Sequence, residues 1–314
     1  MKRYLNTVMP ALLVSLLWLS GCSHKEIICP SDGMRTVEVR FSWELASGAS
    51  PEGMTVYFFP VSQGARIWRF DIPGREGGHV ELPPATYRLL AVNNDLPGIT
   101  FTSQESFGAF TARARSAGSA DLLGPTGMLY GCTVGNVEVT VCGVTYTSSD
   151  GAAKECPLGV IRCRPDSLST VYRIELRDCR GLGNVRSVTG RLQGVAPELR
   201  VADRIPEGEP AASALTFTGA GSTLKGVVTG FGSPAGYPPS FTLVLQVVRK
   251  DGSVIVKNID VTAQVINSKN PRSVFIILEG LEIPDGDKPV DPGGDVGIEV
   301  GVDGWQVIDI ELST

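Results

Sequence analysis

The sequence has 314 residues, of which 42% are hydrophobic and 19% are charged, and its formal net charge is −5. This apolar content excludes a wholly disordered chain, and the acidic balance without clustered Lys and Arg excludes a nucleic-acid-binding protein. The 37 glycines and 21 prolines are typical of many short strands joined by turns, so the expected fold class is all-β.

The first 21 residues have the pattern of an export signal. Lys2 and Arg3 precede an apolar run over residues 8–19, which is shorter than the about 20 residues that a membrane-spanning helix requires. The run ends in Leu19-Ser20-Gly21-Cys22, which resembles the lipobox of bacterial lipoproteins. That resemblance implies a signal peptide over 1–21, a lipid (palmitate or a similar acyl chain) on Cys22, and a tether over 22–34. The alternative is an ordinary secreted protein with a chance cysteine.

The lipid on Cys22 would attach the protein to the outer membrane, and we expect the body at the cell surface. The residues after Cys22 match a surface-export signal only in part, so the periplasmic face stays open as an alternative.

Alternation of apolar and polar residues predicts a half-buried strand from residue 37, with Val37, Val39, Phe41, Trp43 and Leu45 on the buried face. The continuous apolar run from Met54 to Val61 predicts a strand that is covered on both faces.

Further strands are predicted along the rest of the chain. Lys250-Asp251-Gly252 favours a hairpin turn between two of them, because Asp-Gly readily adopts the positive φ angles of a tight turn. Residues 104–117 are the best candidate for a helix, although Gly108 counts against it. The predicted strands cover residues 80–82, 86–92, 136–146, 168–177, 240–248, 254–261, 273–278 and 304–312.

Cys163-Arg164-Pro165-Asp166 interrupts this pattern between two strand-rich halves. We therefore place an N-terminal domain at 35–165 and a C-terminal domain at 166–314. A Pro-, Gly- and Asp-rich stretch at 283–295 is predicted to be a surface loop before one last strand.

Seven cysteines are present, and six remain once Cys22 is set aside as the lipidation site: Cys29, Cys132, Cys142, Cys156, Cys163 and Cys179. Disulfides and buried free thiols are equally compatible with the sequence, and Cys132 could face Cys142 on paired strands. With no C-x-x-C motif and only two histidines, His24 and His79, we expect neither a metal site nor a catalytic site. His79 is predicted to lie in a turn.

Several short motifs resemble the fimbrillin-like lipoproteins of Bacteroidetes. Val56-Tyr57-Phe58-Phe59-Pro60 is followed by the motif Leu82-Pro83-Pro84-Ala85-Thr86-Tyr87-Arg88-Leu89-Leu90-Ala91-Val92-Asn93-Asn94. A later stretch, Gly127-Met128-Leu129-Tyr130-Gly131, matches another family motif, and residues 304–310 are similar to the closing strand of one lipoprotein branch.

This resemblance implies two tandem β-sandwich domains of transthyretin-like topology. In the family, pilus subunits polymerise by strand addition, and in shaft subunits a protease first removes strand one after an Arg or Lys. Here Arg35 and Arg40 lie at or within the first strand, although we favour solvent-facing strand residues at both positions. An anchor subunit would keep its first strand and its lipid.

The resemblance therefore implies a lipid-anchored fimbrial anchor or accessory subunit with a structural or adhesive role, other fimbrial subunits as partners, no cofactor and no enzymatic activity. The alternative is a surface lipoprotein that binds glycan or a host protein outside any pilus. Trp68, Tyr237 and Trp305 are the candidate sugar-stacking rings, and a groove lined by several exposed rings would favour this alternative.

Overall fold

The computed structural model describes residues 33–119, 121–140, 143–147, 153–156, 159–284 and 306–307. Nearly all regular structure in these residues is β-strand, which confirms the predicted all-β class. The exceptions there are two single turns of 3-10 helix, at Glu44–Ala46 and Leu182–Asn184, and the five-residue helix α2 at Thr262–Ile266. Residues from Met34 onward group into one compact unit. Cys22 and the signal sequence lie outside the described residues.

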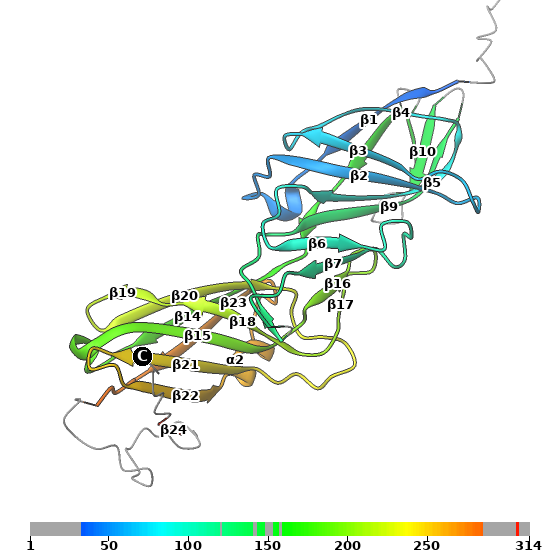
Figure 1. Ribbon diagram of the computed structural model, residues 1–314. Helices are drawn as coiled ribbons and strands as arrows, with labels where there is room; N and C mark the ends of the chain where they lie inside the picture. The colour runs from blue at the N-terminus through cyan, green and yellow to red at the C-terminus, as the bar shows by residue number, and fades with distance from the viewer. Residues whose placement is uncertain are drawn as a thin grey trace, which may run out of the picture. The chain divides into compact units, whose positions relative to one another are not determined.

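A seven-stranded sheet dominates the part of the chain before residue 168, and its central strands β2, β5 and β9 lie side by side in antiparallel pairs (Figure 1). The short strand β13, Asp166–Ser167, pairs with β9 beside the main path of the sheet. In spatial order the other strands are β11 (Ala153–Cys156), β10 (Val144–Thr147), β9 (Tyr130–Val139), β5 (Ala85–Asn93), β2 (Gly53–Pro60) and β3 (Trp68–Pro73).

A second, three-stranded sheet has the order β12-β1-β4, with bounds Val160–Cys163, Arg35–Phe41 and Gly77–Leu82. The two sheets share one hydrophobic core, to which β1, β2, β5 and β9 all contribute buried side chains. Strand β2 lies between β5 and β3, and its alternate residues enter two different clusters. Phe58 packs in this core, while Tyr57 and Phe59 pack in the larger one. The prediction of a strand covered on both faces is confirmed for β2, whereas Val61, at the end of the predicted run, lies beyond the strand and is 54% exposed.

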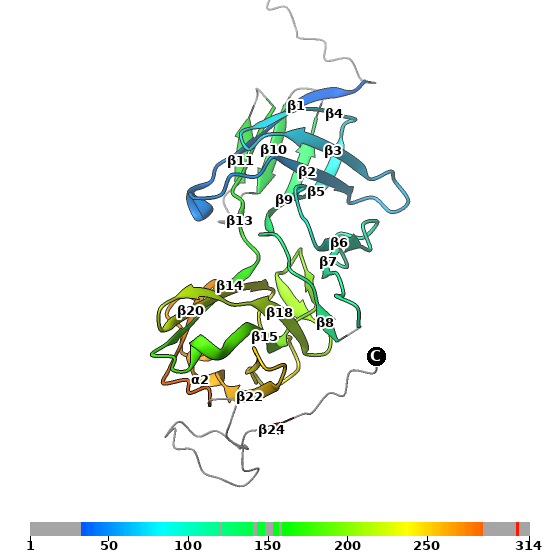
Figure 2. The ribbon, with the colours of Figure 1, turned by 60° about the vertical axis from the view of Figure 1, so that its left-hand side comes forward.

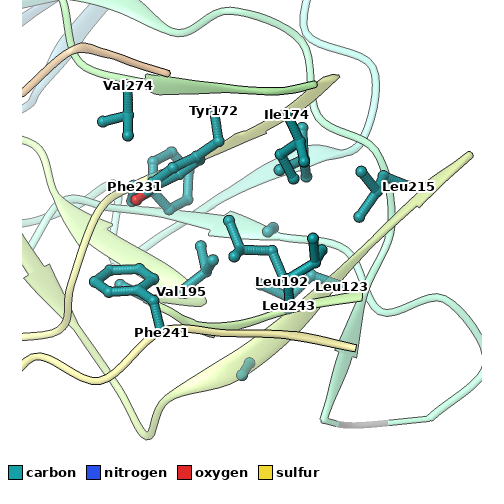
Figure 3. Packing of buried hydrophobic residues seen from close by; sticks show 14 of the residues in the cluster. Leu123, Tyr172, Ile174, Leu192, Val195, Leu215, Phe231, Phe241, Leu243 and Val274 are labelled. Carbon is teal, nitrogen blue, oxygen red and sulfur yellow. The ribbon is translucent and has the colours of Figure 1, made fainter. Parts of the chain in front are cut away.

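Strands after residue 169, together with the short strand β8, form two further sheets around the larger core, whose packing is shown in Figure 3. There Tyr172 lies close to Phe241, with 6.0 Å between the ring centroids. One sheet has the order β19 (Thr218–Ala220), β20 (Thr223–Gly230), β14 (Thr170–Arg177) and β23 (Ser273–Glu279). The other runs β24 (Gln306–Val307), β22 (Val254–Asp260), β21 (Thr242–Arg249), β15 (Val185–Val195), β18 (Ala211–Thr216) and β8 (Leu122–Leu123).

Besides the β13–β9 pairing, two strand pairings join segments from either side of residue 165. Strand β7 (Thr111–Ala114) lies between β6 (Ile99–Thr102) and β16 (Glu198–Arg200), and β16 also pairs with β17 (Ile205–Glu207). Strand β8 runs parallel to β18, beside which it is drawn in Figure 2. The division at residue 165 stays a prediction, and these pairings show that backbone hydrogen bonds link the two segments.

The Lys250-Asp251-Gly252 hairpin is confirmed, because β21 and β22 pair antiparallel across it and Gly252 has a φ of +89°. Asp251 completes the turn by accepting hydrogen bonds from the backbone N–H and the hydroxyl of Ser253, at 2.9 and 2.6 Å.

Four sequence predictions need correction. Strand β1 ends at Phe41 and a 3-10 turn begins at Glu44, so Leu45 turns outward and is 51% exposed. Residues 136–146 are not one strand, because Thr140 closes a turn by bonding to Gly143 and divides the segment between β9 and β10. Residues 104–117 contain strand β7 instead of a helix. His79 lies on β4, not in a turn, and its side chain is exposed.

Candidate strand-addition site

Strand β1 is the middle strand of its sheet and is paired along both edges. It runs parallel to β12, with Phe41 opposite Cys163, and antiparallel to β4, with Arg35 opposite Leu82. Each edge of β1 therefore satisfies backbone groups of a neighbour. Strands β12 and β4 form the two walls of a slot that β1 occupies.

The side chains of β1 fill the core beneath this slot. Val37 and Val39 are fully buried and Phe41 is 4% exposed, while Glu38 and Arg40 point outward. Burying a side chain of this kind contributes roughly 1.5–3 kcal/mol, so these three residues hold β1 in place strongly. The alternation predicted from Val37 to Phe41 is confirmed.

Trp43 fixes the end of β1 after the strand has stopped. Its indole Nε1–H donates to the carbonyl oxygen of Arg75 at 2.7 Å, and the Arg75 guanidinium lies 5.4 Å from the ring centroid. The ring of Tyr130 meets Trp43 edge-on, with 5.8 Å between the centroids. Trp43 thus connects β1 to the loop before β4 and to β9. The alternation pattern predicted that Trp43 is buried, but nothing in it identifies Arg75 as its partner.

The two arginines that could be cut in strand one differ in backbone environment. Arg40 is in register with Arg162 on one side and Gly77 on the other, and its guanidinium bonds to Glu38 at 2.5 and 3.0 Å. Arg35 is in register only with Leu82 of β4. A protease needs an extended, unpaired backbone, so the folded sheet protects the bond after Arg40. The Arg40 side chain is 48% exposed, as expected for a solvent-facing strand residue.

The close approach of β4 to β1 depends on Gly77. Its φ is +120°, and a Cβ there would collide with the carbonyl group of Val39. The glycine therefore allows β4 to start pairing directly beside Arg40, which lies opposite it in register.

Removal of β1 would leave facing rows of unpaired N–H and C=O groups on β12 and β4, above an open apolar groove. Such a slot accepts another strand with alternating side chains, because the strand restores both the hydrogen bonds and the packing. In this structure the slot is filled by the chain's own strand β1.

Two of the quoted sequence motifs meet at Asn93, the last residue of β5. Asn93 is 2% exposed; its amide Nδ2 donates to the Met128 carbonyl at 3.1 Å, and its Oδ1 accepts from the Tyr130 N–H at 2.8 Å. Asn93, near the end of the Leu82–Asn94 motif, thus positions the Gly127–Gly131 motif. The quoted motif includes Asn93, but spacing alone does not show which segment it contacts.

The two proposed sugar-stacking rings that the structure describes, Trp68 and Tyr237, lie on separate elements. Trp68 is half-buried on β3, stacks on Phe70 at 6.5 Å between centroids, and is covered by Arg66 at 4.6 Å. Tyr237 is 43% exposed in the loop before β21. Trp305 lies outside the described residues.

A hollow with a volume of about 610 Å³ lies over the outward side chains of β15, β18, β21 and β22, such as Arg191, Thr216, Val244, Gln246 and Val256. None of its described lining residues is aromatic. The described lining of this hollow therefore lacks the exposed aromatic rings that would favour glycan binding.

Within the described ranges, no three His, Cys, Asp or Glu side chains are grouped so that they could hold a metal ion. In the same part of the chain, no helix is long and apolar enough to cross a membrane. The acidic stretch over 285–295 and Cys29 fall outside the described residues, as does Cys142. Of the cysteines that are described with their side chains, Cys132, Cys163 and Cys179 are all buried free thiols.

The all-β fold is shared with solved structures of a fimbrial anchor protein and of a protein described as an adhesin. A crystal structure titled "putative adhesin" from Bacteroides ovatus matches with a TM-score of 0.64 at 17% identity, covering 86% of this chain and 99% of that one. The fimbrial anchor protein Mfa2 of Porphyromonas gingivalis matches with a TM-score of 0.51 at 14% identity, covering 78% and 90% of the two chains. At these identities the likeness shows a shared fold.

The chain belongs to the protein family described as "Domain of unknown function (DUF5119)", whose model matches residues 21–215. It is also 27% identical over 122 residues to the "Putative fimbrium anchoring subunit Fim4B" of Bacteroides ovatus. That match spans 38% of this chain and 35% of the relative. The resemblance to fimbrial anchor and adhesin proteins of Bacteroidetes is thus confirmed, and the proteins named here are described as fimbrial subunits or adhesins, not as enzymes.

Proposed function

We propose that this protein is a cell-surface fimbrial anchor or accessory subunit, held in the outer membrane by a lipid on Cys22. The observation that carries the proposal is the built-in first strand. Strand β1 fills its own slot with Val37, Val39 and Phe41, and Trp43 fixes its end. A subunit at the base of a pilus needs no strand from a preceding subunit, so a permanently filled slot suits that position.

The names of the similar proteins support the same role. A match to a fimbrium anchoring subunit and a fold shared with a fimbrial anchor agree with a body that lies at the cell surface. The partners would be other β-rich pilus subunits. Strand addition is the expected mode of contact, since the resemblance implies it and an open sheet edge favours it.

The test is native purification from the outer membrane of the source cell, comparing the wild type with Cys22→Ala. We expect the wild type in detergent-resistant assemblies with other β-rich subunits, and the variant in the medium together with those subunits. Cys179→Ala is the matched control, because it removes a buried thiol without touching the lipid site, and it should behave as the wild type does. Purification of the wild type as a single monomeric species would contradict the pilus role.

A further inference from the structure

Two buried cysteines meet inside the core that underlies the β1 slot. Cys132 lies on β9 of the seven-stranded sheet, opposite Ala91 of β5, and is 5% exposed. Cys163 is the last residue of β12 in the three-stranded sheet, opposite Phe41 of β1, and is fully buried. Both side chains belong to the same hydrophobic cluster.

Parts of β12 and β9 approach within 8 Å between Cα atoms, and Gly131, the neighbour of Cys132, is in register with Asp166, which follows Cys163 by three residues. The thiols therefore form an isolated pair in an apolar environment, with no other described cysteine in that cluster.

We propose that Cys132 and Cys163 form a disulfide bond that joins the two sheets of this core once the chain is outside the cytoplasm. Disulfides persist in oxidising compartments, and a bond here draws the two sulfur atoms together to about 2.0 Å. Because Cys163 ends the parallel wall of the slot, the bond ties that wall covalently to the central sheet whether or not β1 is in place.

The oxidant is the disulfide of an extracytoplasmic thiol oxidase or of oxidised glutathione. The thiolate of one cysteine attacks that disulfide to give a mixed disulfide, and one thiolate leaves. The thiolate of the other cysteine then attacks the protein sulfur, and the second thiolate leaves. The two protein thiols lose two electrons and two protons, and the oxidant is reduced to a dithiol or to two thiols.

This thiol–disulfide exchange takes place during folding, before the hydrophobic core has closed around the two cysteines. In the folded core, the hydrogen bond with Cys132 and then burial raise the pKa of the Cys163 thiol well above its usual value, so little thiolate forms. The closed core also excludes an oxidant, since both side chains are inaccessible. The pair is consequently oxidised during folding, and afterwards it is protected from reductants.

The experiment maps the thiols of the full lipoprotein taken from the outer membrane. Cells are lysed in denaturant with an alkylating agent, and the protein is cut with trypsin and a Glu-specific protease. Cleavage after Glu138 separates Cys132 from Cys142, and cleavage after Arg162 separates Cys156 from Cys163. Every cysteine of this region then lies on its own peptide.

We expect the Cys132 and Cys163 peptides as one linked species that separates on reduction, with Cys179 alkylated. Alkylated Cys132 and Cys163, or a bond from either of them to Cys142 or Cys156, would overturn the proposal. This mapping needs no variant, so it holds even if a substitution prevents folding.

A second measurement uses urea unfolding of the same lipoprotein in detergent, with and without dithiothreitol. The reductant reaches the disulfide in the unfolded chain and should therefore lower the unfolding midpoint of the wild type. It should have the same effect on Cys179→Ala, which keeps both Cys132 and Cys163. It should leave the midpoint of the double variant Cys132→Ala/Cys163→Ala unchanged. If dithiothreitol left the wild-type midpoint unchanged, the disulfide would be refuted. A shift in the double variant as large as that of the wild type would also refute it.

Discussion

Asn93 is the buried polar residue whose loss we expect to be felt most strongly. Asn93→Ala removes the acceptor of the Tyr130 N–H and the donor to the Met128 carbonyl, and leaves both backbone groups inside the protein. An unsatisfied buried group costs about 1–3 kcal/mol, so we expect a loss of this order in the free energy of unfolding. Urea denaturation measures it.

The matched control for Asn93 is Asn258→Ala, which changes an exposed asparagine on β22. Surface substitutions of this kind usually stay within about 0.5 kcal/mol. If the two variants lost the same stability, Asn93 would not connect the two motifs in the way its hydrogen bonds indicate.

Asp251 makes the β21–β22 hairpin sensitive to acid. Hydrogen bonds from the side chain and then the backbone of Ser253 lower the pKa of Asp251 below its ordinary value of 3.8. A carboxyl group whose pKa is lowered in the folded state stabilises that state. The stabilisation is complete at pH values above the ordinary pKa of the group. This stabilisation is lost as the pH falls through the lower folded value.

We therefore expect Asp251→Asn to lose less stability than the wild type when the pH is lowered from 5 to about 2, because the amide cannot be protonated in this range. Denaturant unfolding at a series of pH values checks this. Identical pH profiles for the two proteins would mean that the Ser253 hydrogen bonds do not favour the ionised carboxylate.

At the scale of elements, helix α2 covers an otherwise open sheet edge. Among the described strands, β23 is the last in its sheet. The side-chain amide of Gln264 accepts from the Ile277 N–H at 2.8 Å and donates to the Ile277 carbonyl at 3.1 Å, as a neighbouring strand would. Phe275 and Ile277 on this strand are 60% and 37% exposed, which would favour pairing with another molecule if the edge were free.

Gln264→Ala should therefore increase concentration-dependent self-association while changing the stability of the monomer only slightly. Sedimentation velocity over a range of concentrations measures the effect. Gln246→Ala is the matched control, since Gln246 lies on β21, which is paired on both sides. Equal association of both variants would show that Gln264 does not protect the edge.

At the scale of the whole molecule, the proposed anchor role predicts that β1 stays attached in the cell. Protein from the outer membrane should begin at lipidated Cys22 and contain Arg35–Phe41 intact, because the bond after Arg40 is held in a paired backbone. Intact-mass measurement and N-terminal peptide mapping decide this. A chain that starts at Thr36 or Phe41 would instead indicate a processed subunit with an open slot.

The same protection can be tested on the purified protein. Trypsin should cut first at exposed loop residues such as Arg66, and β1 should remain bound to the rest of the chain. Rapid cleavage after Arg40 in the native state would contradict the filled slot.

Sequence reasoning succeeded best where burial is periodic along the chain. The alternation of Val37, Val39 and Phe41 and the continuous apolar run of β2 follow directly from which faces are covered. It failed at Leu45 and at residues 136–146, where a turn interrupts the pattern while the residue types continue it. It also missed α2, because five residues are too few to display a helical period.

The all-β class, the family motifs and the first strand could be predicted from the sequence, since they depend on local patterns of apolar residues and turns. The folded structure was needed to show which strands flank β1, that Asn93 holds the Gly127–Gly131 motif, and that Cys132 and Cys163 share one core. These are contacts between residues far apart in the chain. They arise from sheet order and shared burial, which no local pattern specifies.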